Sequence, residues 1–135
     1  MSKKIELLAI ILFLLSAFSS FSQSSDTTVY LQSEVLGEKR SIIIGLPRNY
    51  HTSDQAYACL YVLDAEYKYD ISRSIHQFFE ISTQLPNTII IGISNSSKEN
   101  RHRDLLPSNF QGKDSLFRDF LENEVIPYVE KEYRC

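Results

Sequence analysis

Two short apolar runs with a helix-like segment between them decide the fold of this chain. The first is Tyr57-Ala58-Cys59-Leu60-Tyr61-Val62-Leu63, and the second is Thr88-Ile89-Ile90-Ile91-Gly92-Ile93. Unbroken apolar runs of this length are typical of strands that are covered on both faces. Residues 67–82 between them space Ile71, Ile75, Phe78 and Phe79 along one face of a helix. The order strand, helix, strand predicts a right-handed parallel βαβ unit.

Two segments rich in β-forming residues precede this unit. Residues 28–36 and 38–46 flank Gly37, which can supply the positive φ that a tight connection needs, so we expect a β-hairpin. Pro47 has no N–H for a strand ladder and should end the second strand. Residues 48–55 are polar, and we expect a loop there.

A second amphipathic helix is predicted near the carboxyl end, after a long polar loop over residues 94–113. Asp114 is its candidate N-cap, and its apolar side chains are Phe117, Phe120, Leu121, Val125 and Tyr128. Pro127 removes one backbone hydrogen bond, so we expect a kink or a late break. The predicted class is therefore α/β, an antiparallel hairpin followed by a parallel βαβα run. A helix that covers a sheet normally leads into another strand, so we expect only a partial domain.

Residues 1–22 have the pattern of a secretory signal peptide. A short positive segment, Met1-Ser2-Lys3-Lys4, precedes an almost wholly apolar run over residues 7–15 and a small, polar stretch over residues 16–22. We expect cleavage before Gln23, one domain over residues 23–135, and a secreted or periplasmic product. The apolar run is shorter than the roughly 20 residues of a membrane span, so we expect no stable span after cleavage. An uncleaved N-terminal anchor is the alternative.

Composition narrows the choice of partners and cofactors. The formal net charge is −3 with no basic stripe, which argues against a nucleic-acid partner. His51, His76 and His102 lack metal-ligand spacing, and no glycine-rich phosphate loop is present, so we expect neither a metal nor a cofactor. Two cysteines are too few for a disulfide scaffold. We expect Cys59 to be a small buried hydrophobe and leave the role of Cys135 open.

The sequence contains no complete catalytic set. A serine nucleophile commonly lies in Gly-x-Ser-x-Gly, and no two of the four glycines are four residues apart. Polar residues do follow the predicted strands, at residues 64–67 and 94–96, with a charged cluster at residues 101–104. Ligands of open α/β sheets bind beyond the carboxyl ends of strands. By spacing alone, the charged cluster is more typical of a solvated turn.

Five segments together resemble the "Putative esterase" family of α/β-hydrolases, which includes esterase D-like and enterochelin-esterase-like enzymes. They are LPRNY at residues 46–50, LYVLDA at 60–65, IGISN at 91–95, RHRDLLP at 101–107 and FLENEVIPYVE at 120–130. The resemblance runs from about residue 40 to residue 135. It implies hydrolysis of carboxylic esters by a catalytic serine. It also implies that the strand with Gly-His-Ser-x-Gly-Gly and the rest of the triad would come later.

The resemblance also implies site residues. The loop after the first parallel strand would form the oxyanion hole, with the backbone N–H groups of Ala65 and Glu66 as candidates. Ala65 stands where many relatives have glycine, and alanine resists a positive φ. Arg103 and Asp104 match an Arg-Asp element at the active-site rim, where they would shape the site without being catalytic. The candidate substrate-binding residues are Asp64, Tyr67, Arg103 and Asp104.

Our leading hypothesis is therefore the N-terminal fragment of a secreted serine esterase. It would lack the nucleophile, be inactive alone, and accept a small-molecule ester once completed. A bare apolar strand would leave such a fragment prone to aggregation. One alternative is a non-catalytic module that binds a ligand with its strand-end loops. Another is a broken or incompletely sequenced gene. The substrate and the oligomeric state stay open.

Overall fold

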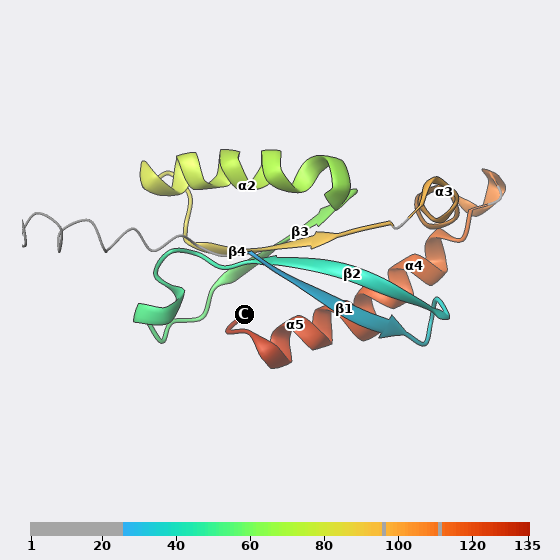
Figure 1. The fold of residues 1–135 in the computed structure, drawn as a ribbon, viewed down its shortest axis with the longest axis horizontal. Coiled ribbons are helices and arrows are strands. Elements are labelled where there is room, and N and C mark those ends of the chain that lie inside the picture. The colour runs from blue at the N-terminus through green and yellow to red at the C-terminus, as the bar shows by residue number, and fades with distance from the viewer. Residues whose placement is uncertain (1–25, 96, 111) are drawn as a thin grey trace, which may run out of the picture.

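The computed structural model describes residues 26–95, 97–110 and 112–135, so the predicted signal peptide lies outside the described residues. The elements in chain order are β1 (Thr27–Ser33), β2 (Glu38–Gly45), η2 (Tyr50–Thr52), β3 (Ala58–Leu63), α2 (Ala65–Ile81), β4 (Thr88–Ile93), α3 (Lys98–Leu105), η3 (Ser108–Phe110), α4 (Asp114–Phe120), η4 (Leu121–Val125) and α5 (Ile126–Glu132). The strands form one sheet in the order β1-β2-β4-β3. Helix α2 lies over one face of this sheet, and α4 and α5 lie over the other (Figure 1). The predicted α/β class is confirmed.

The predicted hairpin and the parallel unit are both present. Strands β1 and β2 pair antiparallel from Thr27↔Ile44 to Ser33↔Glu38, and Gly37 between them has a φ of 67°. Strand β4 pairs antiparallel with β2 and parallel with β3. The helix between β3 and β4 therefore completes the βαβ unit that the apolar runs predicted.

The two apolar runs differ in burial. All six residues of β4 are buried, as predicted for a strand covered on both faces. Strand β3 is not covered in this way, because Ala58 is exposed and Leu60 is 41% exposed. Among the described residues β3 has only one neighbouring strand, β4. The prediction failed for β3 because an apolar run does not distinguish a central strand from an edge strand.

Helix α2 buries a different face from the one that its apolar periodicity marks. The side chains that face the sheet are Ala65, Tyr69, Arg73 and His76. Ile71, Ile75 and Phe78 point into solvent, with exposed fractions of 63%, 54% and 68%. Gly92 of β4 makes the close approach of α2 possible, since a Cβ there would lie 2.6 Å from Cδ2 of Tyr69.

A continuous helical stretch covers the other face of the sheet. Its buried side chains Phe117, Phe120, Val125 and Val129 pack against isoleucines of β2 and β4. Near Pro127 we expected a kink or a break. The structure has a π-helical turn there, η4, followed directly by α5 with Pro127 in its first turn. Of the described helices, none has the length and apolar character needed to cross a bilayer.

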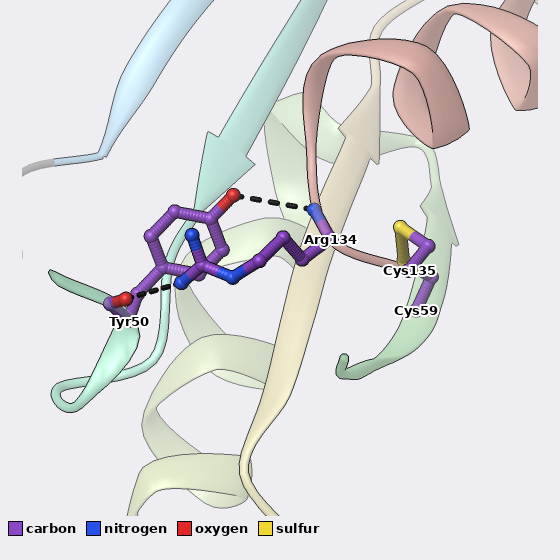
Figure 2. The surroundings of a disulfide bond; sticks show 4 residues. All are labelled: Tyr50, Cys59, Arg134 and Cys135. Carbon is purple, nitrogen blue, oxygen red and sulfur yellow. Dashed lines mark hydrogen bonds between the residues drawn. A yellow bond between two sulfur atoms is a disulfide. The ribbon is translucent and has the colours of Figure 1, made fainter. Parts of the chain in front are cut away.

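Cys59 and Cys135 form a disulfide, with Cα atoms 6.2 Å apart (Figure 2). The expectation of a free, buried Cys59 is therefore wrong: it is partly buried and bonded. A separation of 76 residues left no local signal for this pairing. The disulfide anchors the carboxyl-terminal tail to β3, and the N–H of Tyr57 donates to the carbonyl of Arg134 beside it at 2.8 Å.

Candidate active-site edge

The carboxyl ends of β3 and β4 bring the predicted polar segments together. Asp64 follows β3 directly, and Ser94 and Asn95 follow β4. Helix α2 begins at Ala65, and α3 begins beyond Ser97, whose side chain accepts from the N–H of Asn100 at 3.1 Å. Because β3 and β4 are parallel, all these segments meet at one edge of the sheet.

Asp64 is the centre of this edge. Its backbone is left-handed, with φ 55° and ψ 46°, a conformation that costs a non-glycine residue roughly 1 kcal/mol or more. Its buried carboxylate accepts from Nε and Nη2 of Arg101 at 2.8 and 3.0 Å, from Nζ of Lys68 at 3.0 Å, and from Nδ2 of Asn95 at 2.8 Å. These charge-assisted bonds offset the backbone strain.

The same contacts control the charge of Asp64. Hydrogen bonding from Arg101, and then from Lys68, outweighs burial and lowers the pKa of the Asp64 carboxyl from 3.8 to about 2. The group is therefore ionised throughout the neutral range, and both of its oxygens are occupied. Such a carboxylate is suited to a structural role, in which it links β3, α2 and α3. A general acid or base should instead have a pKa near the working pH.

The predicted oxyanion residues lie in the first turn of α2. The N–H groups of Tyr67 and Lys68 donate to the carbonyl of Asp64 at 2.9 and 3.0 Å, which closes that turn. The left-handed position falls on Asp64, so Ala65 needs no positive φ. Glu66 accepts from the backbone N–H of Asn95 through Oε1 and ties α2 to the end of β4. The assignment of Ala65 and Glu66 as oxyanion donors stays a prediction.

Two adjoining hollows open beside Asp64, and they share Tyr67, Lys98 and Arg101. One has a volume of about 240 Å³ and is lined by Glu66, Tyr67, Asn95, Ser97, Lys98 and Arg101. The other has a volume of about 630 Å³ and is lined by Asp64, Tyr67, Lys68, Lys98, Arg101 and His102. Basic side chains and one exposed tyrosine ring therefore dominate a surface that suits polar or anionic groups of a ligand.

Arg103 and Asp104 lie in a separate ion network that joins α3 to β2. Arg103 makes a bidentate contact with Glu38, at 3.0 and 2.9 Å, and donates through Nε to Asp104 at 2.7 Å. Arg40, which is fully buried, bonds Asp104 and Glu38 and donates to the carbonyl of Ser94 at 3.0 Å. Arg103 lowers the pKa of Glu38, and Glu38 with Asp104 raises the pKa of Arg103.

The predicted site residues therefore separate into two groups. Asp64 and Tyr67 line the hollows, whereas Arg103 and Asp104 belong to the neighbouring network and to neither lining. A role of any of them in substrate binding stays a prediction. Sequence reasoning marked the segments that contain Asn95 and Arg101 but did not name either residue as a binding residue. It missed Lys68 and Lys98, because a lysine in the first turn of a helix resembles ordinary surface. Within the described residues, no group of three His, Cys, Asp or Glu side chains is placed to hold a metal ion.

A profile of the family described as "Putative esterase" matches residues 33–135. The chain belongs to this esterase family. Among solved structures, it is similar to an IroE-like serine hydrolase from Shewanella oneidensis, with 34% sequence identity and a TM-score of 0.75. That match covers 82% of this chain and 39% of the hydrolase. The same fold and a serine-hydrolase relationship thus rest on sequence as well as on shape.

Two more distant esterases share the fold. The enterobactin esterase FES from Shigella flexneri, solved with enterobactin, is 18% identical with a TM-score of 0.67, over 82% of this chain and 27% of that chain. A ferulic acid esterase from Anaeromyces mucronatus, solved with ferulic acid, is 19% identical with a TM-score of 0.63, over 86% of this chain and 46% of that chain. The chain thus spans less than half the length of these relatives. Curated proteins gave no match.

Proposed function

We propose that this chain is the N-terminal part of a secreted serine esterase that acts on carboxylic esters. The family match over residues 33–135 carries the proposal. The serine hydrolase of 34% identity supports it, as does the share of that hydrolase, 39%, that the chain spans. The reaction would be acyl transfer to water through an acyl-serine.

In this proposal the 135 residues supply the oxyanion side of the site and part of the substrate surface. The first turn of α2 offers the backbone N–H groups of Ala65 and Glu66. The hydrogen bonds and ion pairs of the Asp64 carboxylate hold that turn in place. One oxyanion donor can contribute roughly 3–4 kcal/mol to catalysis. The nucleophile would come from elsewhere in the complete enzyme, because these residues contain no Gly-x-Ser-x-Gly. We therefore expect the chain to be inactive alone.

A chimera tests this proposal directly. Residues 33–135 would replace the matching part of the Shewanella oneidensis hydrolase, and hydrolysis of p-nitrophenyl acetate would be measured. We expect turnover by the chimera, and none by the chain over residues 23–135 or by a chimera whose nucleophilic serine is changed to alanine. A chimera that folds cooperatively yet shows no turnover would contradict the proposal, as would turnover by the chain alone.

We also propose a secreted or periplasmic location. The pattern of residues 1–22 supports export, and the Cys59–Cys135 disulfide supports an oxidising compartment. The expected product begins at Gln23. Expression with export, followed by intact-mass analysis of the product, checks both points: a retained residue 1 or two free thiols would contradict them.

The hollows favour a second candidate, a binding module that recognises ligands without catalysis. Lys98 and Arg101 line both hollows and could hold an anionic group, with Tyr67 as an aromatic wall. Titration of the chain over residues 23–135 with ferulate, followed by NMR chemical-shift changes, tests this candidate. Saturable binding that Arg101→Ala removes, and that the network variant Arg103→Lys retains, would favour this module. No saturation at millimolar ferulate would count against it.

A further inference from the structure

Helix α2 has a second apolar side, which points away from the sheet. The side that packs on the sheet consists of Ala65, Tyr69, Arg73 and His76. A different set recurs in alternating steps of four and three residues on the opposite side, and we call it the outer seam: Tyr67, Ile71, Ser74, Phe78, Ile81 and, just past the helix, Leu85. All of these residues are exposed, and the apolar ones have exposed fractions between 41% and 70%.

The spacing of the outer seam is typical of a helix that packs against another helix. Alternating steps of four and three residues keep side chains in one line along a helix, where they fit between the side chains of a partner helix. Figure 1 shows α2 as the outermost described element on its side of the sheet. The helix that this seam fits is therefore not among the described residues of the same copy.

The exposed area of the outer seam is that of a small protein–protein interface. Its five apolar side chains expose on the order of 600 Å² together, if each whole side chain presents roughly 200 Å². Contiguous apolar patches of this size on soluble proteins mark interaction surfaces. Two such seams in contact would bury about 1,200 Å² in total, which is the lower end of the range for specific interfaces.

The outer seam is complementary to itself when two copies of α2 run antiparallel. A twofold axis at the level of residue 76 pairs each position with one of the second copy: Tyr67 with Leu85, Ile71 with Ile81, and Ser74 with Phe78. The large ring of Phe78 thus meets the small side chain of Ser74. A parallel pair would instead place Phe78 against Phe78 and Ser74 against Ser74, which crowds one layer and leaves a gap in another. Antiparallel helices also oppose their dipoles.

The charges of α2 favour a protein partner over a membrane. Glu66, Asp70 and Glu80 outnumber the basic residues Lys68 and Arg73. Arg73 is buried, and Lys68 pairs with Asp64 of the same chain. Helices that lie on membranes are instead rich in lysine and arginine on their polar face.

We propose that two copies of this chain associate through the outer seam of α2, antiparallel and about a twofold axis. The pairing covers Ile71, Phe78 and Ile81, and it is independent of any hydrolysis. Tyr67 belongs to the outer seam and also lines both hollows. Leu85 of the second copy would therefore lie beside the candidate active-site edge, and only the effect of that contact on a substrate rests on the proposed function.

Sedimentation equilibrium of the oxidised chain over residues 23–135 measures the pairing. We expect a monomer–dimer equilibrium with a dissociation constant of roughly 1–100 μM, because the interface is small. Phe78→Lys should raise this constant at least about tenfold, whereas the control Phe110→Lys, outside the seam, should change it less than about twofold. The control is matched, since Phe78 is 68% exposed and Phe110 is 67% exposed. Equal effects of the two substitutions would overturn the proposal.

The other possible occupants of the seam give different results. If the chain stays monomeric up to about 1 mM, the proposal is wrong. Flotation with vesicles of phosphatidylcholine and phosphatidylglycerol then separates the causes. Vesicle binding that Phe78→Lys removes would assign the seam to a membrane, and no vesicle binding would assign it to a different protein segment.

Mixing two variants tests the antiparallel direction. Ile71→Lys and Ile81→Glu should each dimerise poorly, and an equimolar mixture should regain at least about tenfold in affinity. In the mixed dimer the introduced lysine meets the introduced glutamate in one layer, and two isoleucines meet in the other. A mixture of Ile71→Lys with Ile71→Glu should regain nothing, since position 71 meets itself only in a parallel pair. No recovery in the first mixture, or recovery in the second, would overturn the antiparallel arrangement.

Discussion

Asp64 combines an unfavourable backbone with an unusually complete set of partners. The left-handed conformation lets α2 begin immediately after β3, and Arg101, Lys68 and Asn95 hold the carboxylate in place. Sequence position alone predicted that this residue lies at a ligand-binding edge. It did not predict the partners, because Arg101 lies in α3 and Asn95 lies just after β4, 37 and 31 residues away from Asp64. Only the sheet topology brings them to Asp64.

The charge of Asp64 should affect how the free energy of unfolding changes with pH under acidic conditions. Because the folded pKa of about 2 lies below the ordinary 3.8, the carboxylate stabilises the fold fully above about pH 4. This contribution is lost as the pH falls toward 2. Asp64→Asn removes it, and we expect a loss of roughly 1–2 kcal/mol at pH 7 and a shallower dependence between pH 4 and 2. Urea unfolding at several pH values measures both effects. If the free energy of unfolding had the same pH dependence in the parent chain and in Asp64→Asn, the structural role of the Asp64 carboxylate would be contradicted.

Thr83 carries the other strained backbone among the described non-glycine residues, with a φ of 57° at the end of α2. Its N–H donates to the carbonyl of Glu80 at 3.0 Å, and that of Gln84 donates to Phe79 at 2.9 Å, an arrangement that favours glycine. We expect Thr83→Gly to raise the free energy of unfolding by about 0.5–1 kcal/mol. The neighbouring Ser82→Gly, at φ −82°, should give no gain. Thermal melts compare the two, and equal effects would contradict the assignment.

At the scale of elements, the strands and the helix between them could be predicted, but burial within them could not. Segments rich in β-forming residues around Gly37 identified β1 and β2, the apolar runs identified β3 and β4, and the 3.6-residue period identified α2. The face that α2 buries depends on Gly92 and on the neighbours of β3, which no local pattern contains. The same limit applies to Arg40. An arginine in a strand is normally expected on the surface, yet here it is fully buried and paired with Glu38 and Asp104.

The two faces of α2 predict opposite responses to substitution. Tyr69 is 3% exposed against β4, and we expect Tyr69→Ala to cost about 3 kcal/mol or more. Ile75 is 54% exposed on the outer face, and Ile75→Lys should change the free energy of unfolding by less than about 0.5 kcal/mol. It should also reduce self-association by shrinking an exposed apolar patch. Chemical denaturation measures the free energies of unfolding, and analytical ultracentrifugation measures self-association. A large loss of stability in Ile75→Lys would show that the outer face of α2 is covered.

At the scale of the whole molecule, the disulfide joins residues 76 positions apart and closes most of the described chain into one loop. The chain-entropy argument assigns such a loop roughly 4 kcal/mol of stabilisation as an upper value. We expect Cys135→Ser to lower the free energy of unfolding by about 2–4 kcal/mol, and a reductant to lower that of the parent chain equally. Denaturation of both proteins, with and without reductant, measures this. A reductant effect that persists in Cys135→Ser would contradict it.

The central proposal is that these residues build one side of a serine esterase and do not supply its nucleophile. Fluorophosphonate labelling of the oxidised chain over residues 23–135, followed by intact-mass analysis, tests this most directly. We predict no labelled serine under conditions that label the Shewanella oneidensis hydrolase stoichiometrically. One fluorophosphonate per chain on a single serine, lost when the protein is unfolded beforehand, would contradict the account.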